Sequence, residues 1–285
     1  MWHALKALVG KKYNIEELKH NYEENGYFVL KKFFSKRDLA RFDADVNNIW
    51  KNRRTDGGEI TIDVLEGELN GQRLRLKDAP DVTLECAHKV NDLYLESAAC
   101  RNLNLNKKLC SILKEIFADD PLVINSLSFR KGSQQPHHFD TYFMPPPVEN
   151  QMAVSSICLE DQSSEAGPLS FYPGSHKIKP YVFSHGGIHL APGEMKNATA
   201  YIEEEIDKHN LTTETFIGGA GDVFVWHAQL YHGGLPILDE NKTRKTLVTH
   251  YWRRNDVEEE RVAYTKEGES YLKKDHLDVA AAEAA

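Results

Sequence analysis

Residues 221–234 read Gly-Asp-Val-Phe-Val-Trp-His-Ala-Gln-Leu-Tyr-His-Gly-Gly, which combines a turn, an apolar run and a histidine followed by two glycines. The run 223–226 is apolar at every position, which is typical of a strand packed on both faces inside a sandwich of two sheets. We interpret Trp226 as a packing residue of that strand. Glycines after His232 let other groups approach the backbone closely, because they carry no side chain. This segment therefore predicts a buried strand that leads to a crowded site around His232.

The same pattern of short apolar runs recurs on both sides of this segment. The runs are rich in Val, Ile, Phe, Tyr and Thr, and Gly, Pro, Asn and Asp separate them, which is typical of strands joined by turns. Several such strands predict a sandwich or barrel, with the preceding helices packed against one sheet. The predicted strands are 122–129, 152–159, 169–172, 222–226 and 246–252.

Helical patterns precede these strands. Asn14-Ile-Glu-Glu17 resembles a capping box, and Gly26 can end the helix that follows, before an extended segment at 27–30. A second helix is expected after Ser35 and a third at 109–117, because both segments carry apolar residues at three- and four-residue steps.

The organisation predicted from these patterns is a single domain over residues 1–285. It has a helical part at about 1–120, a β core at about 121–255 and a tail at 256–285. Segments 55–83 and 179–216 show no clear period, and we expect them to be long loops that shape a substrate pocket.

The composition is that of an ordinary globular protein with a formal net charge of −8. Basic residues do not cluster, so we expect no nucleic-acid partner, because phosphate binding needs a concentrated Lys/Arg surface. No run approaches the ~20 apolar residues that span a bilayer, and no signal-peptide core is present, so no membrane partner is expected. The four cysteines form no CxxC pair, and we interpret them as buried thiols. These features together predict a cytoplasmic protein.

Two His-x-Asp triplets occur, His138-Phe-Asp140 and His276-Leu-Asp278. In an extended segment alternating residues point to the same side, so an imidazole and a carboxylate two apart can hold one ion. The second triplet lies in the charged tail with no histidine after it, and we interpret it as coincidence. For the first, a further histidine would give two imidazoles and one carboxylate on iron. That set leaves three positions open, as in non-haem Fe(II) oxygenases.

The third ligand must come from a histidine further along the chain, and the glycines beside His232 favour that residue. Arg244 follows a turn-rich segment and precedes the strand at 246–252, so a hairpin could return it to the neighbourhood of His232. A guanidinium makes a two-pronged hydrogen bond to a carboxylate, which would hold the far end of a chelating keto acid. The alternative for Arg244 is an ion pair with Asp239 or Glu240. The histidines available are His176, His185, His189, His209, His227, His232 and His250.

The order and spacing of these motifs resemble the phytanoyl-CoA dioxygenase family of Fe(II)/2-oxoglutarate-dependent oxygenases. This resemblance implies a mainly β fold, with N-terminal helices before a double-stranded β-helix (jelly-roll, cupin-like) core. It also implies that His138, Asp140 and His232 bind iron and that Arg244 binds the side-chain carboxylate of 2-oxoglutarate. The matching segments are 24–30, 135–140, 166–169, 173–177, 221–234 and 244–245.

The activity implied by the resemblance is hydroxylation of a C–H bond of a small organic substrate. Fe(II), 2-oxoglutarate and O₂ would be required, and succinate and CO₂ would be released. Related halogenases have Gly or Ala at the position of Asp140, so hydroxylation is expected here. Desaturation, ring formation or epimerisation by the same iron chemistry are alternatives, and a non-catalytic cupin-like metal-binding protein is an alternative of another class. No basic set for CoA phosphates stands out, which favours a small or medium-sized substrate over an acyl-CoA.

The family often has Ser where this chain has Gly234, so another residue is expected to contact the co-substrate. Arg130 and Lys131 are either ligand contacts or surface residues, and His185 and His189 either touch substrate or lie in a solvated loop. His137, His176 and His227 are interpreted as structural. The candidates for the co-substrate contact are Asn125, Gln135, Thr141 and Tyr142.

Overall fold

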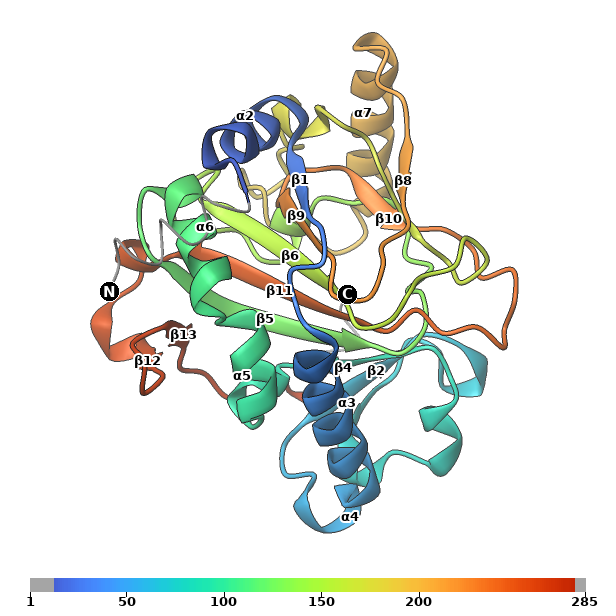
Figure 1. Ribbon diagram of the computed structural model, residues 1–285. Coiled ribbons are helices and arrows are strands. Elements are labelled where there is room, and N and C mark those ends of the chain that lie inside the picture. Colours follow the sequence, from blue (N-terminus) through green and yellow to red (C-terminus); the bar gives the residue numbers. More distant parts are fainter. Residues whose placement is uncertain (1–12, 280–285) are drawn as a thin grey trace.

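The structure is a computed structural model that describes residues 13–279. The expectation that the N-terminus holds no signal-peptide core concerns residues 1–12, which lie outside the described residues. Two β-sheets form the body of the molecule, and helices cover one face of the larger sheet (Figure 1). The mainly β, two-sheet architecture predicted from the short apolar runs is confirmed.

The larger sheet is antiparallel except where β13 (Ser270–Leu272) runs parallel to β5. Strand β12 (Val262–Tyr264) pairs with β13. The other strands of this sheet are, in spatial order, β1 (Tyr27–Leu30), β9 (Val223–His227), β6 (Met152–Cys158), β11 (Thr246–Arg253), β5 (Pro121–Phe129), β4 (His88–Asn91), β2 (Thr61–Val64) and β3 (Arg73–Arg75).

The smaller sheet has the order β10 (His232–Gly234), β7 (Leu169–Phe171), β8 (Glu214–Phe216). One apolar core lies between the two sheets, because alternate residues of each strand point inward. From the large sheet this core takes Val154, Phe224 and Trp226, and from the small sheet Leu169, Phe171 and Phe216.

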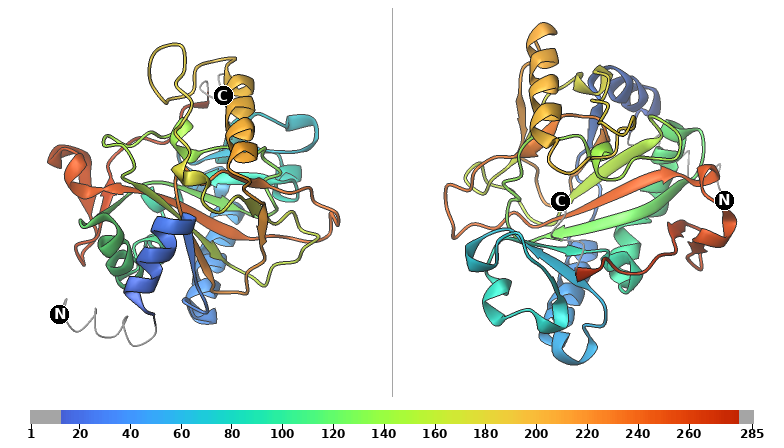
Figure 2. Two further views of the ribbon diagram at one scale, coloured as in Figure 1. Left: turned by 90° about the horizontal axis from the view of Figure 1, so that it is seen from above. Right: turned by 180° about the vertical axis from the view of Figure 1, so that it is seen from behind.

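A second core joins the opposite face of the large sheet to the helices. Here Val225 and Leu247 pack with Phe42 and Ile112. In the view from behind, the other face of β5 and β11 carries no helix (Figure 2). The helices are α2 (Ile15–Asn25), α3 (Lys36–Lys51), α4 (Arg53–Asp56), α5 (Ala98–Asn104), α6 (Lys107–Phe117) and α7 (Met195–Lys208).

Local signals place the first two of these helices as predicted. The side chain of Asn14 accepts a hydrogen bond from the Glu17 amide, which is one half of a capping box, and Ser35 forms a complete capping box with Asp38. Gly26 ends α2 in the left-handed region at φ 81°, where glycine is favoured.

Two segments expected to be loops contain regular structure. Segment 55–83 supplies β2 and β3, and segment 179–216 contains α7 and β8. The apolar stripe of α7, Ala198, Ile202 and Ile206, is only one residue wide, so its helical period is weak in the sequence. The residues before 121 also supply four strands to the large sheet, and the tail after 255 supplies two.

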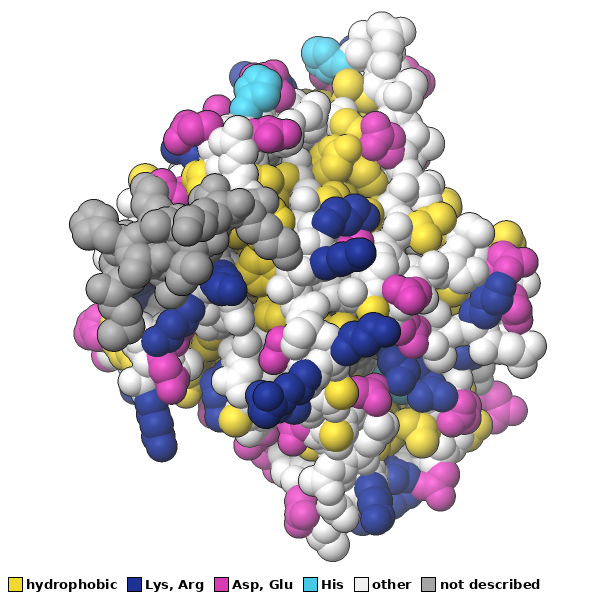
Figure 3. Space-filling model, in the orientation of Figure 1, with side chains coloured by type: hydrophobic (Ala, Val, Ile, Leu, Met, Phe, Trp, Pro, Cys, Tyr) yellow, Lys and Arg dark blue, Asp and Glu magenta, His cyan; other side chains and the backbone are white. Residues whose placement is uncertain are grey.

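The distribution of surface charge and the burial of the cysteines can be compared with what the sequence predicted. On the face shown in Figure 3, Lys and Arg lie among Asp and Glu. All four cysteines are free thiols; Cys100 and Cys158 are buried, but Cys86 and Cys110 are partly exposed, so the expectation of four buried thiols was wrong for two. Within residues 13–279, no helix combines the length and apolar character needed to cross a membrane.

Candidate active site

A single antiparallel bridge places His138 directly opposite His232. The amide of each residue donates to the carbonyl of the other, at 2.8 Å from His138 N and 3.2 Å from His232 N. Residues directly opposite in such a bridge carry their side chains on the same side. The two imidazoles therefore face one space although nearly a hundred residues separate them in the chain.

The glycines after His232 make room for the segment that carries His138. A Cβ on Gly233 would lie 2.8 Å from the carbonyl oxygen of Gln135, and a Cβ on Gly234 would lie 2.7 Å from Oγ of Ser133. A serine at 234 would therefore collide with the segment that leads to the first histidine. Glycine at 234 permits this close approach.

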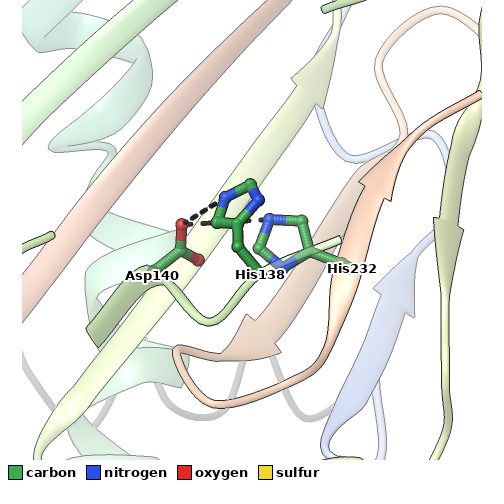
Figure 4. A group of neighbouring side chains, drawn as sticks. All are labelled: His138, Asp140 and His232. Atoms are coloured by element: carbon green, nitrogen blue, oxygen red, sulfur yellow. Dashed lines mark ion pairs between the residues drawn. The ribbon is translucent and has the colours of Figure 1, made fainter. Parts of the chain in front are cut away.

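Asp140 completes the group (Figure 4). Phe139 is extended, so His138 and Asp140 lie on the same side, and Asp140 then opens a short 3₁₀ turn. Its Oδ1 lies 3.7 Å from Nε2 of His138 and 3.8 Å from Nε2 of His232. One ligand atom from each of the three residues lies within 4.8 Å of the other two, which is a set able to hold a metal ion.

The second ring nitrogen of each histidine meets a backbone carbonyl. Nδ1 of His138 lies 2.8 Å from the oxygen of Pro136, and Nδ1 of His232 lies 2.8 Å from that of Leu230. A carbonyl can only accept, so the proton must sit on Nδ1 and the lone pair on Nε2 faces Asp140. This arrangement is the usual support of a metal-binding imidazole.

The protonation states also suit a cation. Burial lowers the pKa of His232 to about 4, so its imidazole is neutral at neutral pH. Burial opposes ionisation of Asp140, but the attraction and hydrogen bonds that the imidazoles of His232, His138 and His250 offer in their protonated forms outweigh it and hold the pKa of this carboxyl well below its ordinary value. Two neutral nitrogens and one carboxylate are the ligands of a non-haem iron site.

Two further residues contact Asp140. Nε1 of Trp226 donates to Oδ2 at 2.9 Å, and Nε2 of His250 lies 3.5 Å from Oδ1. From the sequence, Trp226 was expected only to pack in the core, and His250 was one of several histidines without an assigned role. A buried indole N–H usually finds an acceptor, but the sequence around Trp226 does not indicate which residue that acceptor is.

Arg244 is buried, and its guanidinium has no hydrogen-bond or ion-pair partner among residues 13–279. The alternative ion pairs are not formed, since Glu240 pairs with Lys131 and Asp239 with Lys242. Burial lowers the pKa of Arg244 to about 10, so it stays charged at neutral pH. A buried, unpaired cation is costly, and an anionic ligand would relieve that cost.

The four residues expected to contact the co-substrate differ in which of their polar atoms already have hydrogen-bond partners. Asn125 donates from Nδ2 to Asp92 at 2.9 Å, and its buried Oδ1 has no partner among the described residues. The hydroxyl of Tyr142 accepts from the Tyr181 amide at 3.1 Å. Gln135 is half-buried, and its backbone carbonyl accepts from the Gly234 amide. Oγ1 of Thr141 is likewise buried with no partner in residues 13–279.

The remaining histidines and basic residues lie in structural contacts. His137 bonds Ser170, His176 bonds the carbonyl of Glu23, and His227 is buried against Tyr22. His185 bonds the carbonyl of His189 within the loop that leads to α7, while Arg130 and Lys131 pair with Glu85 and Glu66. The tail triplet is separate from the site, since His276 pairs with Glu96.

Comparison with known proteins agrees with this geometry. A model of the family "Phytanoyl-CoA dioxygenase (PhyH)" matches residues 22–246. The chain is 22% identical over 235 residues to a probable alpha-ketoglutarate-dependent hypophosphite dioxygenase of Stutzerimonas stutzeri, covering 81% of this chain and 77% of that protein. It is 25% identical over 243 residues to the peroxisomal phytanoyl-CoA dioxygenase of Rattus norvegicus, covering 81% of this chain and 66% of that protein.

Solved structures share the fold at lower identity. The non-heme alpha ketoglutarate dependent carbocyclase SnoK from nogalamycin biosynthesis matches with a TM-score of 0.62 at 18% identity, over 84% of this chain and 83% of that one. EctD from S. alaskensis with bound Fe matches with a TM-score of 0.60 at 18% identity, over 84% and 77%. These likenesses confirm the jelly-roll fold. With most of its length matched by the family model, the chain belongs to the phytanoyl-CoA dioxygenase (PhyH) family of Fe(II)/2-oxoglutarate-dependent dioxygenases.

Proposed function

We propose that this protein hydroxylates a C–H bond of a small organic substrate, with 2-oxoglutarate as co-substrate. One observation carries the proposal: the convergent triad of His138, Asp140 and His232 lies in a fold that also buries the unpaired guanidinium of Arg244. The intact carboxylate at Asp140 favours hydroxylation over halogenation, because it fills the position that a halide would need.

In this proposal iron is held by Nε2 of His138, Nε2 of His232 and Oδ1 of Asp140. The donor set fits a ferrous ion, because both imidazoles are locked in the tautomer that binds metal and the carboxylate is ionised. When bound, iron and 2-oxoglutarate supply the O₂-activating chemistry, which the side chains cannot perform themselves.

The protein's own part is to bind, orient and exclude water. Arg244 binds the distal carboxylate of 2-oxoglutarate through a two-pronged hydrogen bond, for which its free guanidinium is suited. Apolar residues of the core between the sheets keep water away from the reacting atoms. No acid or base is needed at the C–H bond.

The substrate side of the site is assigned to the segment that follows Asp140. The ring of Phe143 packs edge-on against His138, with centroids 5.4 Å apart, and remains 38% exposed. An exposed aromatic ring beside a metal ligand is placed to contact an apolar part of the substrate. The loop before α7 is joined to the same segment, since the Leu190 amide donates to the carbonyl of Tyr142.

Conversion of 2-oxoglutarate to succinate under aerobic Fe(II) tests the proposal. The wild-type protein should form succinate, and His138→Ala should fall to the rate of protein-free Fe(II). His276→Ala is the matched control, because it removes a histidine from the other His-x-Asp triplet, and it should retain the wild-type rate. Equal succinate formation by wild type and His138→Ala would exclude the oxygenase and favour a scaffold.

The mass of the product distinguishes hydroxylation from the alternative reactions. A gain of one oxygen atom in a product from a metabolite screen would establish hydroxylation. Loss of two hydrogens would indicate desaturation or ring closure, and an unchanged mass with inverted configuration would indicate epimerisation. Related structures include the epimerase SnoN and the carbocyclase SnoK, so these outcomes are the relevant alternatives.

A further inference from the structure

The two oxygens of Asp140 lie in different surroundings. Oδ1 faces three imidazole nitrogens, those of His250, His138 and His232 at 3.5, 3.7 and 3.8 Å. Oδ2 instead accepts the indole N–H of Trp226 at 2.9 Å. Both residues are buried, with 5% of Asp140 and 2% of Trp226 exposed, so water does not compete for this hydrogen bond.

The indole is held in place by the sheet. Trp226 lies opposite Val154 on β6 and Tyr27 on β1, in the part of β9 that faces the inner core. Its ring packs edge-on against the imidazole of His232, with centroids 5.3 Å apart, and lies tilted against the ring of Phe224, with centroids 5.6 Å apart. A ring fixed on two sides keeps its N–H directed at one oxygen.

This difference matters because a carboxylate can bind a metal through one oxygen or two. An octahedral iron with two imidazoles and a one-oxygen carboxylate has three open positions, two for the keto acid and one for O₂. A carboxylate bound through both oxygens would fill one of those positions. The keto acid would still fit, but the position for O₂ would be lost.

We propose that Trp226 is a positioning residue that keeps Asp140 a one-oxygen ligand and so preserves the coordination position for O₂. The inference rests on the proposed function, since it concerns the same metal site. It assigns a role in the reaction to a residue whose sequence context indicates packing alone.

Trp226→Phe removes the N–H while keeping an aromatic ring in the core. Trp252→Phe is the matched control, because Trp252 borders the same core and its buried Nε1 has no partner among the described residues. In Trp226→Phe, the rate of succinate formation should fall about 10- to 100-fold, the usual effect of losing a group that supports a metal ligand. The affinity of the Mn(II)-loaded protein for 2-oxoglutarate, measured by calorimetry, should stay within about threefold of wild type. Trp252→Phe should change neither quantity by more than about twofold.

A loss of rate shared equally by both variants, or a rate in Trp226→Phe within twofold of wild type, would overturn the proposal. A general packing defect is recognised by a parallel fall in thermal stability and in 2-oxoglutarate affinity, and it too would count against the positioning role.

Indole N–H resonances give a readout that does not depend on turnover. The chain has four tryptophans, so the Trp226 signal is identified by its absence from the spectrum of Trp226→Phe. In the metal-free protein this N–H should exchange slowly with solvent, and after Zn(II) addition it should shift yet remain protected. Loss of protection on metal binding would mean that Oδ2 has left the indole for the metal. If wild type formed no succinate, the proposed function would fail, and this spectrum alone would decide the inference.

Discussion

The ammonium group of Lys274 lies 2.8 Å from Oδ2 of Asp92, a carboxylate with no exposed surface. The other oxygen of Asp92 accepts hydrogen bonds from Nδ2 of Asn125 at 2.9 Å and from the Ser126 amide at 3.1 Å. Asn125 lies opposite His250, which in turn contacts Asp140. The C-terminal segment is therefore tied through a buried carboxylate to the strand that borders the site.

Lys274→Met should lower the free energy of unfolding by about 3 kcal/mol, because removal of one partner leaves a buried charge uncompensated. This loss is at the low end of the range for breaking a buried ion pair, because 24% of the Lys274 side chain is exposed. Chemical denaturation measures the change. Lys273→Met is the control, because Lys273 is exposed on the same segment, and a similar loss in both variants would contradict the role of the ion pair.

Arg244→Met should weaken the binding of 2-oxoglutarate without lowering the free energy of unfolding. Without a ligand, the guanidinium is a buried charge with no partner in the described part of the chain, so an apolar side chain of similar length should leave the free energy of unfolding unchanged or raise it by about 1 kcal/mol. The affinity for 2-oxoglutarate should fall about 10- to 100-fold, as expected when charge-assisted hydrogen bonds are lost.

Calorimetry with Mn(II)-loaded protein and denaturation of the metal-free protein measure the two effects of this substitution. Arg254→Met provides the comparison, because Arg254 already pairs with Glu259 and contacts Tyr264 far from the triad. Unchanged 2-oxoglutarate affinity in Arg244→Met would place the carboxylate elsewhere.

The sequence alone predicted the triad that the structure brings together, and it singled out Arg244, because each is carried by a local pattern: an alternating His-x-Asp, a histidine before two glycines, and an arginine at the start of a strand. The contacts of Trp226 and Asn125 could not be predicted in the same way. They depend on how segments far apart in the chain come together: Trp226 on β9 meets Asp140 in the turn after His138, and Asn125 on β5 meets Asp92 directly after β4. Neither contact follows from the pattern of its own segment.

Tyr142 yields a further prediction. The sequence suggested a co-substrate contact, and in the structure its hydroxyl accepts a hydrogen bond from the Tyr181 amide while its ring packs against Phe183. Tyr142→Phe should therefore leave 2-oxoglutarate affinity within about twofold of wild type. Loss of the hydrogen bond, typically about 1 kcal/mol, should instead loosen the loop that begins at Tyr181.

Limited proteolysis reports the state of that loop, and cleavage there should become about fivefold faster in Tyr142→Phe, as a weakening of about 1 kcal/mol implies. Cleavage at other sites should keep its wild-type rate. A large fall in 2-oxoglutarate affinity with an unchanged loop would instead support the co-substrate contact that the sequence suggested for Tyr142.

His227 makes the stability of the fold depend on pH. Burial lowers its pKa from 6.5 to about 3, and its Nδ1 accepts the Gln229 amide at 3.1 Å. Between these two pKa values the unfolded chain binds one more proton than the folded chain at this residue. The free energy of unfolding must therefore fall as the pH falls from 6.5 toward 3, by up to about 1.4 kcal/mol per pH unit from this group.

His227→Asn keeps an acceptor for the Gln229 amide but removes the titrating ring. Its unfolding free energy should decline less steeply than that of wild type between pH 6 and pH 4.5, although it will be lower at pH 7 through lost packing against Tyr22. Denaturation of both metal-free proteins across this range measures the two slopes. His176 and the metal-site groups titrate in both proteins, so the difference between the slopes isolates His227. Parallel slopes would show that His227 is protonated to the same extent in the folded and the unfolded protein over this pH range. Burial would then not lower its pKa.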